Sequence, residues 1–139
     1  MLVGDFLTLV QYDLPVKVVH FNNSALSMVE LEMLVAGLPS YGTTDTNPDF
    51  AAVARACGAF GLRVEKPRWL AGALRDAFRH KGPALVDIVT DPNAPSIPPK
   101  ISADMVTGFA LSASKMVLDG GVGRMVHMAR SNLRHVPRP

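Results

Sequence analysis

Three short runs of apolar, largely β-branched residues alternate with stretches of helical periodicity. The runs at 16–21, 60–64 and 84–90 have the length and composition of buried parallel strands. Apolar residues at helical spacing occupy 5–11, 26–34, 49–57, 67–80, 102–118 and 123–133. Strands separated by helices favour right-handed βαβ units, and a parallel sheet needs helices on both faces. The pattern therefore predicts an α/β fold with three αβα layers, followed by C-terminal helices.

Local signals place the ends of several elements. Ser24 and Asp49 are predicted N-caps of the helices that follow them. Residues 91–100 contain four prolines and read as a stiff, extended connector. We therefore expect an α/β domain at 1–100 and a helical tail at 101–139.

Composition narrows the class of protein. The chain has 139 residues, 48% hydrophobic and 19% charged, which is typical of a globular protein. Its single cysteine, Cys57, leaves no internal disulfide and no cysteine metal cluster. A net charge of +2 is too balanced to indicate a nucleic-acid partner. We expect a cytoplasmic protein.

The charges are unevenly distributed along the chain. Four arginines and no acidic residue follow Gly120. One interpretation is that 123–139 form a basic amphipathic helix, which can lie on an anionic bilayer. The protein would then be bound peripherally to the inner face of a membrane. The alternative is a helix that packs on the rest of the protein and keeps its polar face in water. Both interpretations remain open at this point.

Asn22 and Asn23 follow the first predicted strand. In open α/β sheets, ligands bind beyond the carboxyl ends of the strands. An asparagine side-chain oxygen can bind Mg²⁺, and the N-terminus of the following helix favours an anion. A strand followed by two asparagines and then a helix is therefore a candidate site for a metal ion and a diphosphate. The alternative is a plain strand-to-helix turn.

The residues around Asn22-Asn23 carry a family resemblance. Residues 4–33, GDFLTLVQYDLPVKVVHFNNSALSMVELEM, resemble the cofactor-binding segment of thiamine-diphosphate-dependent enzymes. The resemblance continues through NPDFAAVARACG, LRVEKP, GPALVDIVTDP, IPPKIS and GFALSASKMVL. Within that superfamily the chain is most similar to pyruvate oxidases and quinone-linked pyruvate dehydrogenases. The resemblance implies part of a pyruvate-decarboxylating oxidoreductase that is homo-oligomeric, uses thiamine diphosphate, Mg²⁺ and FAD, and acts on pyruvate or a related 2-oxo acid.

One family element is missing from the chain. The family carries a Gly-Asp-Gly about 25 residues before Asn-Asn, whereas the only Gly-Asp here is Gly4-Asp5, with Asp5 18 positions before Asn23. The resemblance therefore implies that the metal-binding aspartate and the first strand precede Met1, so that the domain is N-terminally truncated. The family's flavin domain and its aminopyrimidine-activating glutamate are also outside the chain. We expect the chain alone to bind thiamine diphosphate weakly or not at all.

The resemblance also implies roles for individual residues. Asn23 would bind Mg²⁺ through its side-chain oxygen, and Ala25 through its backbone carbonyl. The residues implied to line the diphosphate and thiazolium are Asn23, Ser24, Ala25, Leu26, Ser27, Met28 and Val29. Met28 would cover the thiazolium, with a core methionine as the alternative interpretation.

Glu32 occupies the position of an active-site acid in pyruvate oxidases and would assist proton movements. Glu30, two residues earlier, is expected to be a solvated side chain. Ser27 departs from the family, which usually has glycine there, and a serine restricts close approach to the cofactor.

Two polar residues interrupt the predicted strands. His20 ends the first strand and is favoured as a satisfied core histidine rather than a catalytic base. Asp87, inside the apolar third strand, either faces a polar partner or lies near an edge.

Rival functions remain beside the oxidase interpretation. The chain could be a non-catalytic remnant or an interaction module. It could also be part of a sister enzyme, such as an acetolactate synthase or a 2-oxo acid decarboxylase.

Overall fold

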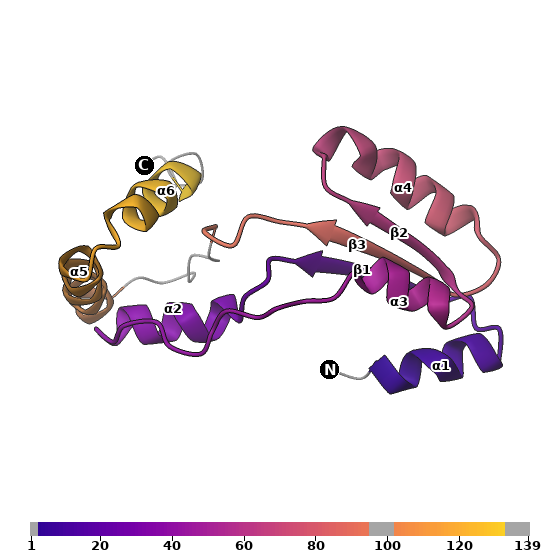
Figure 1. Cartoon of the computed structure of the whole chain (residues 1–139), viewed down its shortest axis with the longest axis horizontal. Coiled ribbons are helices and arrows are strands. Elements are labelled where there is room, and N and C mark those ends of the chain that lie inside the picture. Colours follow the sequence, from indigo (N-terminus) through magenta and orange to yellow (C-terminus); the bar gives the residue numbers. More distant parts are fainter. Residues whose placement is uncertain (1–2, 95–101, 133–139) are drawn as a thin grey trace. The chain divides into compact units, whose positions relative to one another are not determined.

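The computed structural model describes residues 3–94 and 102–132 (Figure 1). Most of the predicted connector, from residue 95 on, lies outside these residues, and so do residues 133–139. The chain divides into two compact units: Met1–Asn23 with Thr46–Thr90, and Ser24–Asp45 with Asp91–Pro139. Each unit is described by itself.

The first unit is built on a parallel sheet. Its strands are β1 (Lys17–Asn22), β2 (Phe60–Val64) and β3 (Ala84–Val89). The order is β1-β3-β2, and both outer strands run parallel to β3. Lys17 and Phe60 both lie opposite Ala84, so all three strands begin in the same row. The predicted α/β class and parallel sheet are confirmed.

Helices cover both faces of this sheet. On one face, α4 (Pro67–Arg79) buries a cluster made up of Val64, Ala73, Ala77, Ala84, Val86 and Ile88. On the other, α1 (Val3–Gln11) and α3 (Phe50–Ala56) contribute Phe6 and Ala54 to a second cluster, against which Cys57 packs. Figure 1 shows α4 on one side of the strands and α3 on the other. The predicted three-layer arrangement is confirmed in this unit.

A glycine sets the distance between α3 and the sheet. A Cβ added to Gly61 of β2 would lie 2.2 Å from the carbonyl oxygen of Ala51. Asp49 caps the N-terminus of α3 by accepting a hydrogen bond from the backbone N–H of Ala52 at 2.9 Å, as its position in the sequence predicts. The cap and the close contact together hold α3 on this face.

The second unit contains α2 (Ser27–Val35), α5 (Ala103–Leu118) and α6 (Val122–Asn132). Carbonyl groups at the C-terminal end of a helix lack partners within the helix. Here the Ser112 hydroxyl donates to the Leu34 carbonyl at 2.8 Å, and Lys115 Nζ donates to the Gly37 carbonyl at 3.0 Å. Side chains of α5 thus satisfy the end of α2.

Candidate cofactor and metal site

Asn22 is anchored at the carboxyl end of β1. It is buried; its Oδ1 accepts from Asn47 Nδ2 at 2.8 Å, and its Nδ2 donates to Asp87 Oδ2 at 3.4 Å. Its backbone carbonyl accepts from the Thr90 N–H at 2.9 Å. Asn23 follows as the last residue of this segment of the first unit. The structure therefore fixes the residue that immediately precedes the predicted metal ligand.

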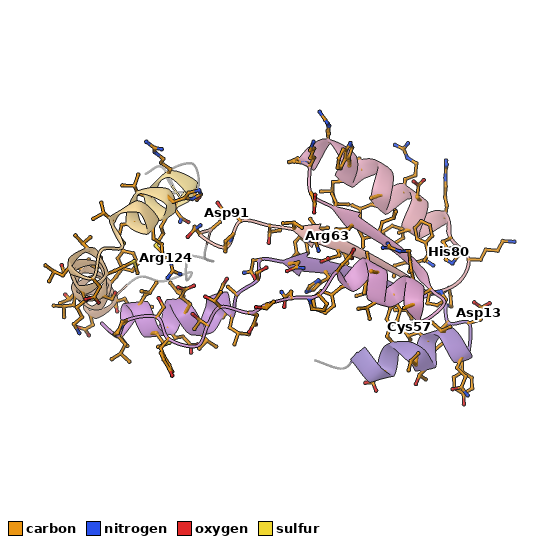
Figure 2. The ribbon with its side chains drawn as sticks, in the orientation of Figure 1. Asp13, Cys57, Arg63, His80, Asp91 and Arg124 are labelled. Carbon is orange, nitrogen blue, oxygen red and sulfur yellow. The ribbon has the colours of Figure 1, made fainter. Side chains whose placement is uncertain are left out.

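A row of polar side chains crosses the sheet just before Asn22. His20, Asp87 and Arg63 lie opposite one another on the three strands. Asp87 is 0% exposed; its Oδ1 lies 2.9 Å from His20 Nδ1, and its Oδ2 accepts from Arg63 at 2.7 Å (Arg63 is labelled in Figure 2). A buried carboxylate is tolerated only when it is paired and hydrogen-bonded in this way.

The row resolves the alternatives left open for His20 and Asp87. His20 is a satisfied histidine that also contacts the edge of the Phe50 ring, at 4.6 Å between centroids. Asp87 lies on the central strand and faces polar partners rather than an edge of the sheet. The pKa of the Arg63 guanidinium is raised, mainly by its hydrogen bond to Glu65 and also by the negative charge of Asp87. Arg63 therefore stays positively charged.

The predicted N-cap at Ser24 is wrong. Helix α2 begins at Ser27, with Leu26 in the N-cap position, and no side chain among the described residues caps it. Ser24 instead adopts a left-handed backbone with φ 54°. Its carbonyl accepts from Asp45, while the Leu26 N–H donates to the Thr43 carbonyl at 2.8 Å. These two bonds close a bridge that pairs residues 24–26 with another segment, so a helix cannot start there.

The first turn of α2 presents apolar side chains to solvent. Met28 is 60% exposed, and Leu26 and Val29 are also exposed. Met28 is therefore not a core residue of the described structure, which removes the alternative given above. Its predicted place over a thiazolium ring stays a prediction. Ser27, the position where the family usually has glycine, is partly buried.

Glu30 is not a solvated side chain. It is 6% exposed and pairs with Arg124 of α6, labelled in Figure 2. The prediction failed because the partner lies 94 residues away, beyond the reach of any local pattern. Glu32, the predicted active-site acid, is exposed on the same helix.

Part of the basic tail packs within the second unit. Met128 of α6 is buried, and Arg124 is held by Glu30, whereas Val126 is exposed. Among the helices in the described ranges, none combines the length and apolarity required to cross a membrane. Peripheral contact through 123–139 stays a prediction.

Asp91 holds the turn that follows β3. It accepts from the Asn93 N–H at 2.8 Å and from the Ser131 hydroxyl of α6. The hydrogen bond from Ser131 is the main cause that lowers the pKa of Asp91, followed by the bond from Asn93. Ser131 also lies 3.5 Å from His127, but the hydroxyl stands between acid and imidazole, the wrong order for activating a nucleophile.

The predicted metal ligands are oxygen atoms, which suit a hard cation. Within residues 3–94 and 102–132, no cluster of three or more His, Cys, Asp or Glu side chains is placed to bind an ion. Asp5, which belongs to the only Gly-Asp in the chain, is an exposed residue of α1. The predicted ligands, the Asn23 amide and the Ala25 carbonyl, are neutral oxygens. Such a set fits Mg²⁺ that is also bound by phosphate oxygens and water.

Comparison with known proteins identifies the family. The chain belongs to the thiamine pyrophosphate enzymes, because its residues 1–88 match their C-terminal TPP binding domain. Thiamine pyrophosphate is the same compound as thiamine diphosphate. Residues 1–88 of the chain are therefore a TPP-binding domain of this family.

Named relatives give the finer context. The chain is 40% identical over 110 residues to the "Putative thiamine pyrophosphate-containing protein YdaP" of Bacillus subtilis, a match that covers 79% of the chain and 19% of the relative. It is 33% identical to acetolactate synthase isozyme 3 large subunit of Escherichia coli, over 66% of the chain and 17% of the relative. It is also 33% identical to the mitochondrial acetolactate synthase catalytic subunit of Saccharomyces cerevisiae, over 70% of the chain and 14% of the relative. The chain spans less than a fifth of the length of each.

Proposed function

We propose that the chain supplies the Mg²⁺- and diphosphate-binding part of an enzyme that decarboxylates pyruvate or a related 2-oxo acid. The observation that carries the proposal is the anchored Asn22 at the carboxyl end of a parallel strand, with Asn23 next in the chain. Ligands of open α/β sheets bind at such strand ends. The family assignment supports thiamine diphosphate as the ligand.

Particular oxygens would bind the metal and the diphosphate. Asn23 would contribute its amide oxygen and Ala25 its carbonyl, with phosphate oxygens and water completing the Mg²⁺ shell. The N-terminus of α2, which starts at Ser27, favours negative charge. When bound, the thiazolium of the cofactor supplies an electron sink for decarboxylation.

The side chains of α2 would shape the surroundings of the cofactor. Met28, Leu26 and Val29 form an apolar surface that would cover a thiazolium ring and exclude water. Glu32, exposed and one turn from Met28, would hold or move a proton near the reacting carbon. Ser27 would limit how closely the backbone approaches the cofactor.

Two branches of the family are candidates for the complete reaction. The IPPKIS connector and the position of Glu32 favour a pyruvate oxidase or quinone-linked pyruvate dehydrogenase, with FAD, a homo-oligomer and peripheral membrane contact through 123–139. The names of the relatives from Escherichia coli and Saccharomyces cerevisiae favour an acetolactate synthase. The product from pyruvate separates the branches: an oxidase reduces an electron acceptor, and a synthase releases acetolactate.

The test of the binding proposal is an NMR titration of the ¹⁵N-labelled full chain with Mg²⁺ and thiamine diphosphate. The sequence allows weak binding or none, and the proposal predicts weak binding. We expect a dissociation constant weaker than micromolar, with the largest shifts confined to residues 22–29 and dependent on Mg²⁺. The variant Asn23→Ala should reduce those shifts, whereas Gly72→Ala, on the exposed face of α4, should not. Absence of Mg²⁺-dependent shifts at millimolar ligand would contradict the proposal and favour the interaction module.

A further inference from the structure

Each strand of the sheet carries one charged or titratable side chain at its fourth position. These are His20 of β1, Arg63 of β2 and Asp87 of β3, and the register places them in one row. We propose that Asp87 is a positioning residue, which acts through Asn22 to set the orientation of Asn23. For its ligand, the inference rests on the proposed function.

The burial of Asp87 is the first step of the argument. A carboxylate that is 0% exposed costs free energy unless its partners offset the loss of hydration. His20 contacts Oδ1, and Arg63 donates to Oδ2. With Arg63 facing one carboxylate oxygen and His20 in contact with the other, Asp87 still accepts the hydrogen bond from Asn22.

The second step is the direction of the Asn22 amide. An ionised carboxylate can only accept hydrogen bonds, so the group that Asn22 presents to Asp87 must be its Nδ2. The other end of the amide, Oδ1, is thereby turned toward Asn47, which donates to it at 2.8 Å. Asp87 and Asn47 therefore each favour this orientation of the Asn22 amide.

The third step leads from Asn22 to Asn23. Side chain and backbone of Asn22 are both held, since its carbonyl accepts from the Thr90 N–H. The chain thus leaves β1 from a fixed residue, and Asn23 begins from a defined backbone position. Residues that hydrogen-bond to a metal ligand and orient it typically lower metal affinity by about 10-fold to 100-fold when they are mutated.

The proposal separates two substitutions at the same position. In Asp87→Asn, the amide oxygen can still accept from Arg63 and Asn22, while its NH₂ donates to a His20 tautomer with an unprotonated Nδ1. In Asp87→Ala, the acceptor for Asn22 is lost. A purely structural role predicts damage in both variants, because both remove the charge that faces Arg63. A positioning role predicts that Asp87→Asn retains function.

The first measurement is made without ligand. Side-chain ¹⁵N relaxation of Asn22 and Asn23 in the full chain reports their motion on the picosecond-to-nanosecond timescale. We expect Asp87→Ala to mobilise both amides and Asp87→Asn to leave them as ordered as in the parent chain. Val86→Ala is the matched control: Val86 is the adjacent residue of β3, buried in the α4 cluster on the opposite face. It should lower stability without mobilising Asn23.

The second measurement is the titration with Mg²⁺ and thiamine diphosphate. Asp87→Ala should weaken binding by up to about tenfold, the lower end of the loss found when a direct hydrogen-bond partner of a metal ligand is removed, because Asp87 acts through Asn22. Asp87→Asn and Val86→Ala should stay within about twofold to threefold of the parent chain, since neither removes the acceptor for Asn22. If Asp87→Ala does not fold, Asn47→Ala removes the hydrogen bond to Asn22 Oδ1 and should mobilise both amides.

The two readouts separate failure of the inference from failure of the proposed function. If Asn23 is as ordered in Asp87→Ala as in the parent chain, or if Val86→Ala mobilises it equally, the positioning role is wrong whether or not the ligand binds. If the parent chain does not bind Mg²⁺ and thiamine diphosphate, the proposed function fails, and the relaxation data still decide the coupling from Asp87 to Asn23.

Discussion

The contact between Gly61 and α3 predicts a large loss of stability for a very small substitution. In Gly61→Ala, the new Cβ would start 2.2 Å from the Ala51 carbonyl oxygen, with the Ala51 carbonyl carbon at 3.1 Å. Ordinary contact requires the helix or the strand to move by about 1 Å, and overpacking of this kind costs about 3 kcal/mol. A small domain has about 5–15 kcal/mol in total, so the loss is a substantial fraction of its stability.

Urea unfolding followed by tryptophan fluorescence measures this loss. The only tryptophan of the chain, Trp69, lies on α4 in the same unit as Gly61. With an m-value of about 1.5 kcal/mol/M, the midpoint should fall by about 2 M.

Gly72→Ala is the matched control for the same chemical change. Gly72 lies inside α4, where an added Cβ meets nothing within 4 Å among the described residues. Because alanine favours helix more than glycine does, this variant should be more stable by about 0.5–1 kcal/mol. A neutral Gly61→Ala, or an equal loss in both variants, would refute the reasoning.

Three further predictions concern single contacts. Arg124→Ala removes the ion-pair partner of the buried Glu30 carboxylate and should lower the free energy of unfolding by about 2 kcal/mol. The loss is smaller than for a fully buried pair because Arg124 is 42% exposed. A double-mutant cycle with Glu30→Gln should give a coupling energy between the two side chains above about 0.5 kcal/mol. Ser131→Ala removes the main cause of the lowered pKa of Asp91, so ¹³C NMR should find this pKa closer to 3.8. Since a lowered pKa stabilises the fold only above the unfolded value, the stability difference from the parent chain should shrink as the pH falls below about 4. Asp49→Ala should cost about 1 kcal/mol and speed amide exchange in the first turn of α3; unchanged exchange would argue against the cap.

The sequence predicts the sheet because its signals are local. Each strand is a short run of mostly apolar residues, and Asp49 lies only three residues before the N–H that it caps. The polar row was missed as a unit, although its signal is present: His20, Arg63 and Asp87 are each the fourth residue of their strand. In a parallel sheet whose strands start in one row, equal positions lie side by side.

Contacts between distant segments account for the failures. Ser24 has the chemistry of an N-cap, but its left-handed backbone and the bridge between Ala25 and Thr44 prevent a helix from starting there. Glu30 is polar and next to an exposed residue, yet Arg124 pairs with it across 94 positions. Neither partner is visible in the local pattern, because both depend on how the chain returns to α2.

The order β1-β3-β2 has a consequence for synthesis on the ribosome. The central strand is the last of the three to be made, and both outer strands pair with it rather than with each other. A nascent chain that has not yet reached Ala84 therefore lacks the strand with which β1 and β2 pair in the described sheet. Until residues 84–89 leave the exit tunnel, these pairings cannot form, and apolar strands exposed in this interval are prone to aggregate.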